Sequence, residues 1–87
     1  MLFFDKEPDF INDEGTKWWI DKVTTQYAQK EDSQGTKLPN VHCFYIELKT
    51  GEKLYVLVEN NEIIYETQSL EQVGIQIDIL KLLKRSK

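Results

Sequence analysis

The sequence predicts an α+β domain in which a three- or four-stranded antiparallel β-meander is covered by a C-terminal α-helix. Short runs of β-branched and aromatic residues recur between residues 41 and 67, and the connections between them contain glycine and asparagine. A capping pattern then precedes an apolar stretch near the C-terminus. The chain of 87 residues has the length of one small domain, which we expect to span 1–87 without a linker.

The N-terminal region over residues 1–15 is acidic. Between residues 5 and 15, Lys6 is the only basic residue, and the apolar anchors are Phe10 and Ile11. We expect an arm that runs partly extended along the surface. The sequence leaves open whether this arm is ordered or flexible.

Residues 17–29 allow two interpretations. A helix would bring Trp19 or Ile20 to the same side as Val23 and Tyr27, whereas a strand would separate Trp18 from Trp19. The segment is rich in tryptophan, threonine, valine and isoleucine, which favour strands because they lose rotamer freedom in a helix. We therefore favour a strand, which would be the fourth of the sheet, and keep the helix as the alternative. The next segment, 31–40, contains Asp, Ser, Gly, Pro and Asn, which predict a surface loop.

Three strands are expected over 41–49, 52–58 and 62–67. Thr50-Gly51 and Asn60-Asn61 join them, and glycine and asparagine tolerate the positive φ that tight hairpins require. The sequence therefore predicts an antiparallel meander.

Side chains alternate along a strand, so the 41–49 strand has two distinct faces. We expect its core face to comprise His42, Phe44, Ile46 and Leu48. The other face carries Val41, Cys43 and Tyr45, so apolar residues occupy both sides of the sheet. One covering helix does not account for both sides, which indicates a further cover or a partner.

The C-terminal helix is expected to begin after Ser69 and to span 70–85. Ser69 is followed three residues later by Gln72, the spacing of a capping box in which each side chain bonds to a backbone N–H of the other residue. Basic residues at the end of the segment suit the negative end of the helix dipole.

The apolar arc of this helix is wider than one sheet can cover. One sector comprises Leu70, Val73, Ile77, Leu80 and Leu83, and the second comprises Ile75, Ile79 and Leu82. The clearly polar side carries Glu71, Gly74, Asp78, Lys81 and Arg85. The second sector could be covered by the N-terminal segment (Leu2, Phe3, Phe4, Phe10 and Ile11), or by a partner or a second copy of the chain. The sequence leaves both alternatives open.

The inventory of catalytic groups is small. His42 and Cys43 are the only histidine and the only cysteine, and adjacent residues of a strand point to opposite faces, so they cannot form a nucleophile and base pair. The acidic residues lack the spacing of a calcium loop, and the scattered glycines lack that of a phosphate loop. We expect no enzyme activity, no metal and no cofactor.

The composition limits the classes of partner and the cellular location that we expect for this chain. Fifteen acidic against 11 basic residues, with a net charge of -4, argue against a binder of phosphate backbones. Charged residues make up 30% of the chain, which argues against a membrane protein, and a single cysteine without a signal-like N-terminus indicates the reducing cytoplasm.

The leading hypothesis is a non-catalytic protein-interaction module, self-associating as a dimer or acting as a small inhibitor of a partner protein. We expect partner contacts through Trp18, Trp19, Ile75, Ile79 and Leu82, because exposed tryptophans and unpaired apolar helix faces anchor partners. The alternatives are single-stranded nucleic-acid binding through an exposed tryptophan flanked by Lys17 and Lys22, and an enzyme with an unrecognised carboxylate or tyrosine site.

Overall fold

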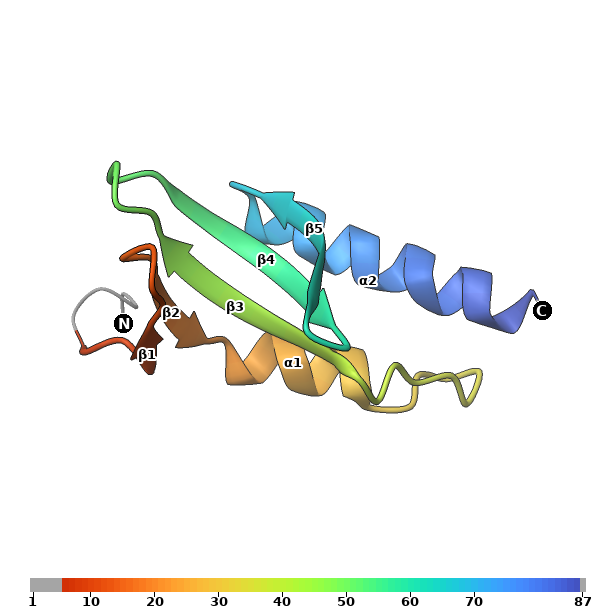
Figure 1. Cartoon of the computed structure of the whole chain (residues 1–87). Coiled ribbons are helices and arrows are strands. Elements are labelled where there is room, and N and C mark those ends of the chain that lie inside the picture. Colours follow the sequence, from red (N-terminus) through yellow and green to blue (C-terminus); the bar gives the residue numbers. More distant parts are fainter. Residues whose placement is uncertain (1–5, 87) are drawn as a thin grey trace.

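The computed structural model describes residues 6–86, which form an antiparallel sheet of five strands and two helices (Figure 1). The strands lie in the order β1-β2-β3-β4-β5, so each pairs with its neighbour along the chain. The predicted α+β class and C-terminal helix are confirmed, with five strands in place of the expected three or four. The elements are β1 (Phe10–Ile11), β2 (Lys17–Ile20), α1 (Lys22–Gln29), β3 (Val41–Glu47), β4 (Lys53–Glu59), β5 (Glu62–Thr67) and α2 (Leu70–Arg85).

The meander of β3, β4 and β5 follows the prediction closely. Gly51 adopts a φ of +94° in the first hairpin, and its N–H donates to the carbonyl oxygen of Leu48 over 2.8 Å. Asn60 and Asn61 adopt φ values of 53° and 67°, the pair of left-handed conformations that a two-residue hairpin needs. A register shift between β4 and β5 at Leu57 and Val58 forms a bulge next to this turn.

The strand favoured for residues 17–29 is correct only for its first part. The chain leaves β2 after Ile20, and Asp21 caps α1 by accepting hydrogen bonds from the N–H and the hydroxyl of Thr24, at 3.1 and 2.7 Å. Thr25 then accepts from the N–H of Cys43 at 2.9 Å, and Ala28 is fully buried. The cap and these contacts with the sheet outweigh the strand propensity of the segment, because propensity is a weak prior.

The described part of the N-terminal arm is an ordered edge of the sheet. In β1, Phe10 pairs with Trp18, and the carboxylate of Asp9 accepts from the N–H of Ile20 at 2.7 Å. The side chain of Asn12 accepts from two backbone N–H groups, which closes the turn into β2. Residues 1–5, with Leu2, Phe3 and Phe4 of the predicted cover, lie outside the described residues.

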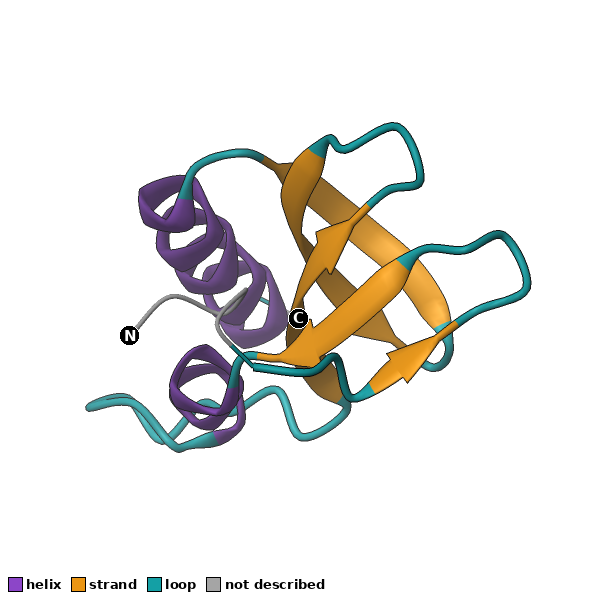
Figure 2. Ribbon diagram, turned by 90° about the vertical axis from the view of Figure 1, so that its left-hand side faces the viewer, coloured by secondary structure: helices purple, strands orange, loops and turns teal. Residues whose placement is uncertain are grey.

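Both helices lie on the same side of the twisted sheet (Figure 2). The main core between these layers contains Ala28, Leu38, Val41, Cys43, Leu57, Val73 and Ile77. The expected core face of β3 is therefore wrong: the helices cover Val41 and Cys43, whereas His42 and Phe44 lie on the other face. Alternation along the strand holds, but alternation alone does not determine which face the helices take.

The second face of the sheet has a smaller apolar cluster. Ile46 and Val56 are buried there, and aromatic rings from β1, β2 and β3 pack beside them. This cluster explains why the sequence places apolar residues on both sides of the sheet. Among the described residues, neither helix is long and apolar enough to cross a membrane.

Candidate interaction surface

Helix α2 begins at the predicted residue. The hydroxyl oxygen of Ser69 accepts from the N–H of Gln72 at 3.4 Å, as the capping pattern requires. The N–H of Ser69 itself donates to the hydroxyl of Thr67 at 3.1 Å, so Thr67 takes the place expected for the Gln72 side chain. On the inward side of α2, Val73 and Ile77 are fully buried against the sheet.

The polar side of α2 faces α1. The ammonium of Lys81, only 2% exposed, donates to the carbonyl oxygens of Tyr27 and Lys30 at 2.8 and 3.1 Å. Carbonyls of the last helical turn lack partners within their own helix, and a cation is favourable at this end of the dipole. Asp78 accepts a hydrogen bond from the Tyr27 hydroxyl, which raises the pKa of that tyrosine. Lys81 thus connects the C-terminal end of α1 to the C-terminal half of α2.

The last turn of α2 holds the loop that precedes β3. A guanidinium nitrogen of Arg85 lies 2.6 Å from a carboxylate oxygen of Asp32, and Lys84 donates to the carbonyl oxygen of Lys37 at 2.7 Å. The Asp32 carboxylate also accepts from the N–H of Thr36, which holds its pKa below the usual value, with a smaller contribution from Arg85. The surface loop predicted for 31–40 is therefore anchored to α2.

The outward side of α2 is an exposed apolar stripe, which we name the α2 face. It consists of Ile75, Ile79, Leu82 and Leu83, which are 43%, 43%, 59% and 56% exposed. Ile79 follows Ile75 by four residues, and Leu82 and Leu83 follow Ile79 by three and four residues, so all four side chains share one side of the helix. The stripe contains the three helix residues predicted to bind a partner. It also contains Leu83, which the predicted first sector groups with Val73 and Ile77; that assignment is corrected, because Leu83 lies four residues after Ile79 and shares its side of the helix.

Phe10 and Ile11, the two residues of the predicted N-terminal cover that the structure describes, do not cover this stripe. They pair with β2 at the far edge of the sheet from β5, whereas α2 packs beside β4 and β5 (Figure 1). Among the residues that the structure describes, the α2 face is open to solvent.

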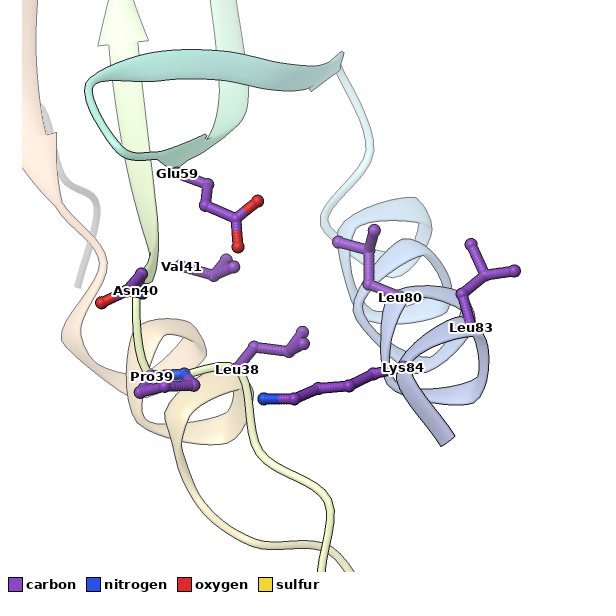
Figure 3. Close-up of a pocket in the computed structure, with 8 residues that line it drawn as sticks. All are labelled: Leu38, Pro39, Asn40, Val41, Glu59, Leu80, Leu83 and Lys84. Carbon is purple, nitrogen blue, oxygen red and sulfur yellow. The ribbon is translucent and has the colours of Figure 1, made fainter. Parts of the chain in front are cut away.

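Two hollows border the α2 face. One, of about 300 Å³, separates α2 from the loop that holds Asp32 and is lined by Ile75, Ile79, Leu82 and charged neighbours. The other, of about 490 Å³, lies between the start of β3 and the end of α2. Figure 3 shows Leu38 and Val41 on one side of it and Leu80 and Leu83 on the helix side, with the charged ends of Glu59 and Lys84 at its margins. Apolar side chains of a partner could enter both hollows.

The two tryptophans lie on β2, away from the α2 face. Trp19 is 2% exposed, and its indole N–H donates to the carbonyl oxygen of Lys6 at 3.0 Å, so its ring cannot anchor a partner. Trp18 is half-buried. Its ring stacks on Phe10 with 5.4 Å between ring centroids, and it lies edge-on to Phe44 with 5.2 Å between ring centroids. The five residues predicted to bind a partner therefore do not form one site.

His42 and Cys43 point to opposite faces of β3, as the strand pattern predicts. The Cys43 thiol is fully buried 3.9 Å from a carboxylate oxygen of Asp21, and burial raises its pKa to about 12. The His42 ring lies 3.4 Å from the side-chain nitrogen of Gln29. In residues 6–86 there is no group of three or more His, Cys, Asp or Glu that could hold a metal ion.

No protein-family model, curated protein or solved structure matches this chain.

Proposed function

We propose that this chain is a non-catalytic protein-interaction module that binds through the α2 face. One observation carries the proposal: four large apolar side chains, each at least 43% exposed, line up on the outward side of a helix whose inward side is buried. Single exposed apolar residues are ordinary on protein surfaces, whereas a contiguous stripe is typical of a binding surface.

The rigidity of α2 supports this proposal. Val73 and Ile77 bury one side of the helix, and Lys81 and Arg85 bond it to α1 and to the loop at Asp32. A surface that is already held in place loses little conformational entropy when a partner binds. The α2 face is therefore preorganised for docking.

The protonation state of Cys43, the candidate nucleophile, supports a non-catalytic role. The thiolate is the reactive form of cysteine, and the pKa of Cys43, raised to about 12, keeps the thiol protonated near neutral pH. A buried, free thiol also suits a reducing cytoplasm, which we include in the proposal as the location.

Site-specific photo-cross-linking tests the proposal. A photoreactive amino acid is placed at Leu82 on the α2 face or, as a matched control, at Val23, which is 79% exposed on α1. After irradiation in the producing cells, we expect a protein adduct from position 82 that is absent from position 23. Adding Ile79→Glu should remove this adduct. Equal adducts at both positions, or none at 82, would contradict the proposed function.

A further inference from the structure

We infer that the partner on the α2 face is a second copy of this chain, with the two α2 helices packed antiparallel about a two-fold axis near Ile79. This inference rests on the proposed function and names the occupant of the same surface. Three features of α2 support it: the spacing of its apolar stripe, the placement of its charges and the direction of its dipole.

The apolar stripe is self-complementary. Ile79 stands near its centre, Ile75 lies four residues before it, and Leu82 and Leu83 lie three and four residues after it. In an antiparallel two-fold pair, Ile79 packs against its own copy, and Ile75 meets the partner's Leu82 and Leu83. Each contact then occurs twice, as the symmetry of a two-fold interface requires.

Charges at the two ends of α2 select the antiparallel orientation. Glu71 lies in the first turn and Arg85 in the last. On an ideal helix they fall within about 40° of one another, on the same flank of the stripe. An antiparallel pair places Glu71 beside the partner's Arg85, whereas a parallel pair would leave these two residues at opposite ends of the interface. Opposed helix dipoles favour the same orientation.

The other bonds of this flank leave these contacts available. Arg85 uses one guanidinium nitrogen for Asp32, and its remaining donors can reach the partner's Glu71. Asp78 lies on the same flank next to the two-fold axis and therefore approaches its own copy, but its hydrogen bond with the Tyr27 hydroxyl directs the carboxylate toward α1 of its own chain.

The size of the stripe predicts a weak dimer. A helix of 16 residues is about 24 Å long, and one face of it is much smaller than the roughly 800 Å² that each partner buries in a standard stable interface. We therefore expect a dissociation constant of about 10 µM to 1 mM, which belongs to the weak end of protein association. Leu82 and Leu83 border the two hollows, so the partner's side chains can add contact area there.

Sedimentation equilibrium of the full chain is the first test. Between about 10 µM and 1 mM, the concentrations that bracket such a weak interface, the mass should rise from that of the 10.3 kDa chain toward twice that value. Ile79→Glu and the milder Leu82→Gln should each weaken dimerisation at least tenfold, because they bury polar groups in the contact. Val23→Glu, on α1, should dimerise like the wild type. Circular dichroism of each variant checks that it is folded.

A charge exchange tests the orientation. Glu71→Arg and Arg85→Glu should each weaken the antiparallel dimer, because each variant puts two like charges side by side in both of the symmetry-related contacts. The double variant Glu71→Arg/Arg85→Glu should recover wild-type dimerisation. The double variant also lacks the bond between Arg85 and Asp32. Its recovery would therefore show that Arg85→Glu weakens the dimer through the lost contact with the partner's Glu71 and not through the lost bond to Asp32.

The outcomes separate this inference from the proposed function. A chain that stays monomeric at 1 mM while position 82 still cross-links a different protein overturns the second copy and leaves the interaction module in place. A dimer unaffected by both Ile79→Glu and Leu82→Gln, or single charge variants that dimerise normally, also overturns the inference. A monomer without any adduct at position 82 overturns both.

Discussion

Lys81 of α2 caps α1 through the carbonyl oxygen of Tyr27, which accepts from its ammonium at 2.8 Å, while the same ammonium lies 4.8 Å from the centre of the Tyr27 ring. One buried cation therefore satisfies a helix end and contacts an aromatic face. The Lys81 ammonium also connects α2 to the carbonyl oxygen of Lys30 at the end of α1, which lies 51 residues earlier in the chain. This link holds α2 in the position that leaves its apolar stripe outward.

The first prediction concerns this link. Lys81→Met should lower the free energy of unfolding by about 1 to 3 kcal/mol, because the carbonyls of Tyr27 and Lys30 lose their buried donor. Lys84→Met is the matched control, since Lys84 is exposed and makes one bond to Lys37, and it should cost less than about 0.5 kcal/mol. Urea denaturation measures both. Equal losses of unfolding free energy in the two variants would show that the Lys81 hydrogen bonds stabilise the fold no more than the exposed Lys84 bond does.

The second prediction tests the cap of α1. Asp21→Ala should destabilise the chain by about 1 to 2 kcal/mol, because Thr24 loses the acceptor for its N–H and its hydroxyl. Asp21→Asn retains a capping oxygen and should cost clearly less. If the alanine and asparagine variants unfold at the same midpoint, the cap is not what starts the helix.

The third prediction is a pH dependence. Burial raises the pKa of Cys43 from its ordinary value of 9.0 to about 12 in the folded chain. The unfolded chain therefore releases this proton first, so the contribution to stability is complete below pH 9 and is lost as the pH rises toward 12. At most about 4 kcal/mol is at stake.

Cys43→Ala is the variant that reveals this dependence. It should lower stability at neutral pH through lost packing, yet its stability should decline less steeply than that of the wild type between pH 9 and 10. Burial also raises the pKa values of Tyr45 and Tyr55, so these tyrosines contribute above pH 10 in both proteins. Parallel declines in the two proteins would mean that the thiol titrates normally.

The fourth prediction concerns the tryptophans. A labelled single-stranded oligonucleotide should not bind at low salt, because the Trp19 ring is buried, the Trp18 ring is stacked on Phe10, and Lys17 lies 3.9 Å from Glu47. Fluorescence anisotropy at low and high salt measures this. Salt-sensitive binding that Trp18→Ala abolishes would instead support a nucleic-acid surface on β2.

The elements that could be predicted from the sequence depend on local interactions. Asn60 and Asn61 tolerate positive φ, and Ser69 caps a helix within three residues, so these positions identify themselves without distant contacts. Ile75, Ile79 and Leu82 were recognisable because the apolar arc of the helix exceeds what one sheet covers, whereas the exposure of Leu70 and Leu83 was not predicted. The Asp21 cap is equally local, but the β-branched and aromatic residues around it concealed it.

Other features required knowledge of which elements meet. The pattern of β3 determined that Val41 and Cys43 lie opposite His42 and Phe44, but only the docking of both helices decided which pair is core. The sequence likewise determined that Lys81 belongs to the polar side of α2. Only the tertiary structure placed it against the end of α1, because the carbonyls that it caps lie on a segment about fifty residues earlier, and no local pattern encodes that contact.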